Sequence, residues 1–231
     1  QAHQERPRPA GELREVYDAL QSCMAWDTIY EPVKQRVVSP VSRNWSCNCG
    51  GYSLFCWDNY FAALLASFEC REIAYANAVE ITREAVPAGF VPNCANAVFH
   101  SHDRSQPPVG SAMVKAVYER CQETWFIEEV FDGLLRWNRW WPENRDTDGL
   151  LCWGSNPYTP RVDNFWELNG VNERFGGALE SGLDNSPMYD DIPFDQERHQ
   201  LCLADVGLNG LYVWDCDSLA RLADELGRHG E

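Results

Sequence analysis

The spacing between helical patterns most constrains what this 231-residue chain can fold into. Apolar residues recur at helical intervals in seven stretches, at about residues 12–26, 57–68, 71–86, 108–121, 124–141, 197–214 and 217–226. The links between these stretches are alternately short and long. Short links favour antiparallel helix hairpins, and the long loops then gather at one end of the helices. We therefore expect about seven helices, no strand, and a site built from the long loops.

The sequence predicts one domain and leaves its cellular compartment open. Residues 1–11 are polar and proline-rich, which predicts a flexible leader before one domain at residues 12–231. No apolar run approaches the ~18 residues that a membrane-spanning helix needs. Ten cysteines and one glycosylation sequon at residues 44–46 leave both the cytoplasm and secretion open as compartments.

The net charge of the chain limits which classes of binding partner we expect. The chain carries 35 acidic and 19 basic residues, a formal net charge of −16. A nucleic acid or an anionic membrane surface is therefore not expected as a partner, because both are bound through basic surfaces. Neutral polar ligands such as sugars remain open, and the ten tryptophans suit them, since indole faces stack on sugar rings as well as fill cores.

The stretch at residues 179–191 is the first candidate for chemistry. Gly182 permits backbone angles that other residues avoid, and Pro187 restricts the residue before it, so the loop should be stiff. A stiff loop that presents Asp184 at a fixed angle could position a general acid. The alternative is an acidic turn in which polar side chains cap the backbone.

Three more clusters lie in or beside the long loops. Trp57 and Asp58 could stack on a sugar ring and bind its hydroxyls, or could be a core tryptophan beside a helix-capping aspartate. Arg104 and Gln106 offer hydrogen-bonding groups in a proline-stiffened loop, or form a surface ion pair and a turn. Trp153 could provide a second aromatic platform. No cysteine and histidine spacing matches a zinc module, and the His100–His102 stretch is only a remote metal candidate.

The order of these motifs carries a family resemblance. The sequence reads W-D-N-Y-F at 57–61, G-F-V-P-N at 89–93, R-S-Q-P-P at 104–108 and E-S-G-L-D-N-S-P at 180–187. This order resembles glycoside hydrolase family 63, which includes mannosylglycerate and glucosylglycerate hydrolases. It is similar, more distantly, to the family 37 trehalases.

The resemblance implies a fold and a reaction. The implied fold is an all-α (α/α)6 toroid of helical hairpins, of which this chain would form the N-terminal portion, with about seven of twelve helices. The implied reaction is hydrolysis of a small α-glucoside or α-mannoside with inversion. Asp184 is then the general acid, and the base is a Glu expected beyond the end of this chain. No cofactor is required, although a structural calcium ion stays compatible with the fold.

The resemblance also suggests which residues contact the sugar. These are Trp57, Asp58, Asn93, Arg104, Gln106, Trp153, Gly154, Glu180 and Gly182. Because an incomplete toroid would expose apolar helix faces, a missing C-terminal half or a second copy of the chain is an expected partner. The alternative function is a non-catalytic sugar-binding protein, or a truncated remnant of the same fold.

Overall fold

The computed structural model describes residues 10–44, 51–158 and 170–230. Within these ranges the chain forms seven α-helices, which are α1 (Glu12–Asp27), α2 (Cys56–Ala66), α3 (Arg71–Arg83), α4 (Gly110–Cys121), α5 (Thr124–Arg145), α7 (Arg174–Glu180) and α8 (Val206–Glu225). Most of the expected leader and most of the sequon lie outside the described residues. None of the described helices is long and apolar enough to cross a membrane.

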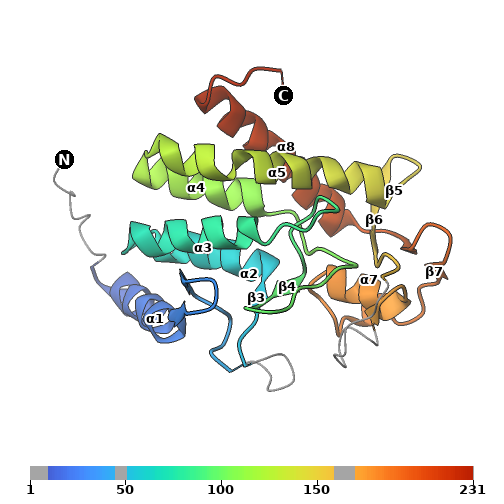
Figure 1. Ribbon diagram of the computed structural model, residues 1–231, viewed down its shortest axis with the longest axis horizontal. Helices are drawn as coiled ribbons and strands as arrows, with labels where there is room; N and C mark the ends of the chain where they lie inside the picture. The colour runs from blue at the N-terminus through green and yellow to red at the C-terminus, as the bar shows by residue number, and fades with distance from the viewer. Residues whose placement is uncertain (1–9, 45–50, 159–169, 231) are drawn as a thin grey trace.

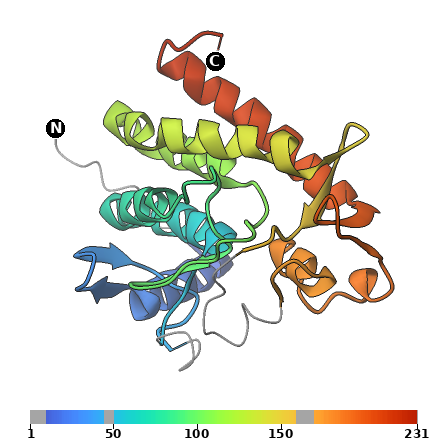
Figure 2. The same cartoon turned by 45° about the vertical axis from the view of Figure 1, so that its right-hand side comes forward.

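The long helices pack as neighbouring hairpins (Figure 1). Helices α2 and α3 form one hairpin, and α4 and α5 form the next. Helix α2 contacts α4, which in turn contacts α8, while α3 contacts α5 on the other side of the core. Figure 2 shows the same order from a second direction, with α8 lying across the α4–α5 hairpin. The short links between helices thus produce the antiparallel pairs that the sequence predicted.

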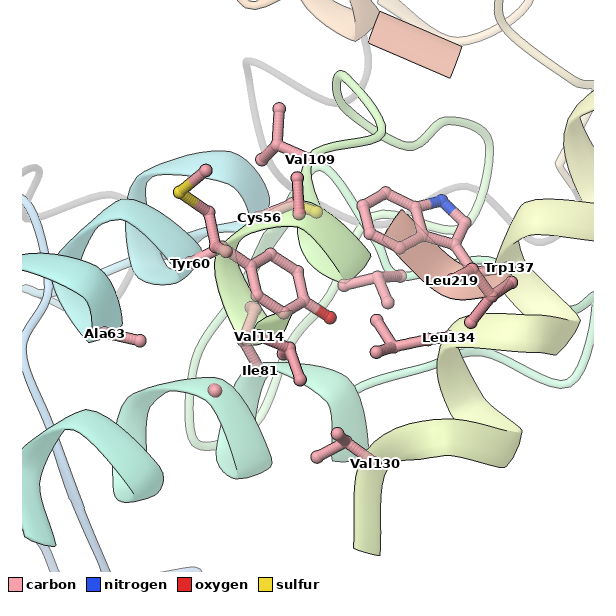
Figure 3. Packing of buried hydrophobic residues seen from close by; sticks show 14 of the residues in the cluster. Cys56, Tyr60, Ala63, Ile81, Val109, Val114, Val130, Leu134, Trp137 and Leu219 are labelled. Atoms are coloured by element: carbon pink, nitrogen blue, oxygen red, sulfur yellow. The ribbon is translucent and has the colours of Figure 1, made fainter. Parts of the chain in front are cut away.

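The core lies between these hairpins (Figure 3). Tyr60 of α2 stacks on Trp137 of α5 with 5.8 Å between ring centroids, and both side chains are buried. Gly110 at the start of α4 makes this contact possible, because a Cβ there would lie 2.7 Å from the Trp137 ring. The Tyr60 hydroxyl lies 2.9 Å from the hydroxyl of Thr82 on α3, so its polar end is satisfied.

The expectation of an all-α toroid is wrong, because the structure also contains β-strands. A hairpin joins β1 (Ile29–Glu31) to β2 (Arg36–Val38), and β3 (Leu54–Phe55) pairs with β4 (Cys94–Ala95). A four-stranded antiparallel sheet has the order β5-β6-β8-β7, formed by β5 (Asp146–Thr147), β6 (Leu150–Gly154), β8 (Gln200–Ala204) and β7 (Phe194–Asp195). Strands of two to five residues are too short to show a clear alternating pattern in the sequence.

Two helix boundaries also differ from the prediction. Pro142 does not end α5, which continues to Arg145 before the sheet begins. The patterns at 197–214 and 217–226 are a strand followed by one continuous helix, α8. Asp215 interrupts the apolar pattern of that helix, but it is buried and accepts hydrogen bonds from the Ser111 backbone N–H and the Asn138 side chain. The position between the two predicted helices is therefore a buried hydrogen-bonding site inside one continuous helix.

Candidate active site

The predicted loop motifs meet around one pocket of about 260 Å³. It lies where the start of α2, the β4 loop and the chain after α7 come together. Seven of the predicted site residues line it, namely Trp57, Asp58, Asn93, Arg104, Gln106, Gly182 and Asp184. Phe55 and Phe99 add apolar surface to the same wall. A concave site with aromatic surface and a few polar groups is typical of small-ligand binding.

Amide side chains fix the loops of this pocket to one another. The Asn93 side chain donates to the Leu179 carbonyl at 3.0 Å, and its backbone carbonyl accepts from the Cys56 N–H at 3.1 Å. The Gln106 side-chain oxygen accepts from the Trp57 N–H at 3.2 Å. These bonds join the start of α2, the R-S-Q-P-P loop and the end of α7, so the pocket wall is held by the same residues that line it.

Arg104 forms an ion pair with Asp103, as the alternative interpretation of this loop expected, but the pair is buried rather than at the surface. One terminal nitrogen of Arg104 lies 2.9 and 2.8 Å from the two oxygens of Asp103, and both side chains are buried. The Ser155 hydroxyl donates to the same carboxylate at 2.6 Å. The only local signal for Asp103 is its place directly before the R-S-Q-P-P motif.

Glu180 lies behind the pocket and accepts hydrogen bonds from three segments. Its two oxygens lie 2.6 and 2.9 Å from the guanidinium of Arg145, 3.0 Å from the Ser105 N–H and 2.6 Å from the Gly154 N–H. Glu180 and Arg145 are both fully buried. Because Glu180 ends α7, this cluster attaches the Asp184 loop to the R-S-Q-P-P loop and to β6.

Trp153 and Gly154 are also placed outside the pocket lining. The Trp153 side chain is 3% exposed, and its indole N–H donates to Asp205 at 2.8 Å. A Cβ on Gly154 would lie 2.9 Å from the Arg145 guanidinium, so the glycine allows that side chain to reach Glu180. The structure therefore brings seven of the ten predicted site residues to the pocket and places Trp153, Gly154 and Glu180 behind it. Their roles toward a sugar stay a prediction.

Partial burial changes the acidity of the two pocket carboxyls. Desolvation, with a smaller contribution from the nearby charge of Asp184, raises the pKa of Asp58 to about 6. Desolvation also raises the pKa of Asp184, while a backbone hydrogen bond and the positive charge of Arg104 act in the opposite direction. Asp184 as a whole residue is nevertheless exposed, so its desolvation is only partial. A carboxyl that stays protonated to higher pH is suited to donate a proton.

The structure offers no metal centre within the described ranges. No group of three or more His, Cys, Asp or Glu side chains there is arranged to hold an ion. The rings of His100 and His102 lie 4.2 Å apart, and His102 stacks on Tyr158 at the same distance. The His100–His102 stretch therefore takes part in an aromatic cluster with Tyr158.

Residues 51–231 match the family model for the mannosylglycerate hydrolase MGH1-like glycoside hydrolase domain. The chain belongs to this family. The resemblance to glycoside hydrolase family 63 is thereby confirmed. A search of curated protein sequences gave no match.

Solved structures show the same fold as this glycoside hydrolase domain at low sequence identity. An uncharacterized conserved protein from Thermus thermophilus has a TM-score of 0.65 and 17% identity, covering 92% of this chain and 59% of its own. The GH63 mannosylglycerate hydrolase from Thermus thermophilus in complex with glucose has a TM-score of 0.64 and 18% identity, covering 91% and 58%. The complex of that enzyme with Tris and D-glycerate has a TM-score of 0.52. The chain thus spans less than two thirds of the length of these structures.

Gly182 gives the glycoside hydrolase domain a testable close contact. Its φ is +69°, and a Cβ there would lie 2.7 Å from the Trp57 indole. We expect Gly182→Ala to lower the free energy of unfolding by about 2–3 kcal/mol, from backbone strain plus displacement of the indole. Chemical denaturation measures this loss. Gly227→Ala is the matched control, because Gly227 has a φ of +68° but no atom near its missing Cβ. The contact is unimportant if both variants lose the same stability.

Proposed function

We propose that the protein containing this chain is an inverting α-glycosidase that hydrolyses a small α-glucoside or α-mannoside, such as glucosylglycerate or mannosylglycerate. The observation that carries the proposal is Asp184 itself. Its carboxyl lines a pocket beside Trp57, and partial burial raises its pKa. Family membership supports the class of reaction.

In the proposed mechanism, Asp184 protonates the glycosidic oxygen as the bond to the sugar breaks. Trp57 offers an aromatic face to the ring, and Gly182 allows the Asp184 loop to approach that indole closely. Asp58 and Arg104 bind hydroxyl groups. Glu180 supports the Asp184 loop from behind, because it joins α7 to the Arg104 loop through Ser105. The chemistry needs two carboxyl groups and no cofactor.

The second carboxyl group, which acts as the catalytic base, is proposed to lie in another part of the protein. Among the described residues, Asp58 and Asp184 are the carboxyls that line the pocket. An inverting pair stands about 6.5–9.5 Å apart, with a water between the base and the sugar. We propose that a Glu beyond this chain supplies the base and faces the pocket from its open side, as the family resemblance implies.

An apolar face on α8 supports a further protein contact. Val206, Val213 and Trp214 lie along one side of this helix and are 88%, 68% and 44% exposed. Their spacing puts them on one stripe of the helix. We propose that the remaining part of a longer polypeptide, or a second copy of the chain, covers this stripe.

Sugar release by the full-length protein tests the proposed function. Purified protein is incubated with α-mannosylglycerate and α-glucosylglycerate, and free hexose and glycerate are measured with time. We expect both products in equal amounts from at least one substrate. Binding of the sugar without release of either product would instead favour the alternative, a non-catalytic sugar-binding protein.

The pH dependence of the rate follows from the acid. Asp184 can donate only while it is protonated, so kcat/KM should fall as the pH rises through its pKa. Because partial burial raises this pKa above the ordinary 3.8, the falling limb should lie above pH 3.8. Initial rates measured from pH 3 to pH 9 locate the limb. A rate that still rises with pH through this whole range would contradict the role of Asp184 as the acid.

A further inference from the structure

The loop that carries Asp184 has very little buried surface beyond the pocket. Within the described stretch 182–199, Tyr189 is the only buried residue, and its side chain is 1% exposed. Leu183 and Met188, on either side of Asp184, are 51% and 43% exposed. A segment with so few buried contacts has low local stability. The place of the Asp184 carboxyl therefore depends on how the two ends of its loop are held.

Asp205 holds the Tyr189 side chain at the C-terminal end of this loop. The Tyr189 hydroxyl donates to one oxygen of Asp205 at 3.0 Å, and the Trp153 indole N–H donates to the same oxygen at 2.8 Å. The other oxygen accepts from the Gly207 N–H at 2.6 Å. Asp205 is itself 9% exposed, so these bonds are largely shielded from water. One carboxylate thus joins the Asp184 loop to β6 and to the start of α8.

Two further contacts show which part of this anchor depends on the tyrosine hydroxyl. The Arg174 guanidinium, at the start of α7, donates to the Tyr189 backbone carbonyl at 2.6 Å, and this bond would survive a change of the side chain. Desolvation, opposed by a hydrogen bond with Ser181, raises the pKa of Tyr189 to about 12, so the hydroxyl remains a donor at neutral pH. Tyr189→Phe would therefore remove the bond to Asp205 while the ring and the backbone contact remain.

We propose that Tyr189 is a positioning residue for glycoside hydrolysis, because its hydrogen bond to Asp205 fixes the loop so that Asp184 reaches the glycosidic oxygen. This inference rests on the proposed function, with Asp184 as the acid. Tyr189 is not among the described residues that line the pocket, so it acts through the loop and not on the sugar. A displacement of about 1 Å at a reacting group can slow a reaction by about 10²-fold. Loss of the hydroxyl should therefore slow the step that needs the proton.

Kinetics of Tyr189→Phe in the full-length protein test the proposal. One substrate is α-mannosylglycerate or α-glucosylglycerate, and the other is an aryl α-glycoside of the same hexose with an acidic phenol, which needs no proton to leave. We expect kcat for the glycerate glycoside to fall by at least about fivefold. The kcat for the aryl glycoside and the dissociation constant of the free hexose should change by less than about twofold. A tyrosine that only stabilises the fold would lower both rates by the same factor.

Tyr118→Phe is the matched control for this variant. The Tyr118 hydroxyl also donates to a carboxylate, that of Glu225 on α8, at 3.1 Å. Neither residue is among those that line the described pocket, so the control should keep both rates within about twofold of wild type.

Hydrogen exchange of the free protein gives a second measurement that does not depend on hydrolysis. The backbone N–H groups of Ser186, Tyr189 and Asp190 donate to carbonyls within the loop at 2.8, 3.2 and 3.3 Å. If the hydroxyl of Tyr189 anchors the loop, exchange in peptides that cover these groups should be at least about threefold faster in Tyr189→Phe than in wild type or Tyr118→Phe.

The outcomes separate this inference from the proposed function. If the wild-type protein releases no hexose from either glycerate glycoside, the proposed function fails, and the catalytic role of Tyr189 fails with it. If wild type is active but a folded Tyr189→Phe protein loses equal factors on both substrates, loses no activity, or keeps wild-type exchange in the loop, only the role of Tyr189 is refuted. If Tyr189→Phe does not fold, Asp205→Asn takes its place, because asparagine still caps α8 but offers one oxygen to both sets of donors. Equal losses on both substrates in that variant would also overturn the proposal.

Discussion

Replacing Asp184 with asparagine should lower kcat for a glycerate glycoside by about 10²–10⁴-fold. Asparagine keeps the size of the side chain but cannot protonate the leaving oxygen. Ground-state binding of the sugar should change by no more than about threefold, because the pocket wall keeps its other contacts. Initial rates of hexose release and the dissociation constant of glucose, both with the full-length protein, measure the two effects.

Two controls, a variant of a neighbouring carboxylate and a second substrate, distinguish the loss of a general acid from damage to the site. Asp190 lies on the same loop, is exposed and does not line the pocket, so Asp190→Asn should keep the wild-type rate within about twofold. In an aryl α-glycoside of an acidic phenol, the phenolate can leave without being protonated. Asp184→Asn should therefore slow hydrolysis of that substrate far less. Equal losses on both substrates would point to damage of the site rather than loss of an acid.

Replacing Arg145 with alanine should lower the free energy of unfolding by about 3–5 kcal/mol. The change leaves Glu180 buried and charged without the two guanidinium contacts at 2.6 and 2.9 Å. Since small domains are stable by only about 5–15 kcal/mol, this loss should be visible as a large fall in the denaturation midpoint. Urea unfolding followed by tryptophan fluorescence measures it.

An exposed ion pair provides the control for this prediction. Arg221 contacts Asp217 at 3.0 Å, and both side chains are largely exposed, at 62% and 59%. Arg221→Ala should therefore cost less than about 1 kcal/mol. Replacing Arg145 and Glu180 together with methionine should restore part of the loss, because no unpaired charge remains, although the Ser105 and Gly154 N–H groups lose their acceptor. A loss in Arg145→Ala as small as in Arg221→Ala would contradict the structural role of this cluster.

The sequence predicted the long helices because their packing is local and periodic. The pattern at 12–26 is α1, and the pattern at 124–141 is α5 without its last turn. The strands were missed because each is held by pairing with a distant segment rather than by its own alternation. The β6–β8 pair, for example, joins Cys152 to Ala204. Pairing between remote short segments leaves little trace in local composition.

The same difference between local and remote signals explains which residues of the candidate site could be predicted from the sequence. Trp57, Asp58, Arg104 and Asp184 were found because each stands in a compact motif, and the structure places all four on one pocket. The ion pair of Arg104 with Asp103 was expected only at the surface, and Arg145 was missed, because burial and a partner 35 positions away leave no local signal. Spacing alone could not distinguish the residues that line the pocket from those that hold it in place.

Proton NMR of the first product formed by the full-length protein tests the central claim most directly. The protein is mixed with α-mannosylglycerate or α-glucosylglycerate, and the anomeric signals of the released hexose are recorded before mutarotation. An inverting glycosidase with Asp184 as its acid should release the β-anomer first, and Asp184→Asn should release none at a comparable rate. Initial release of the α-anomer, or no hexose from either substrate under conditions where the sugar binds, would contradict the account.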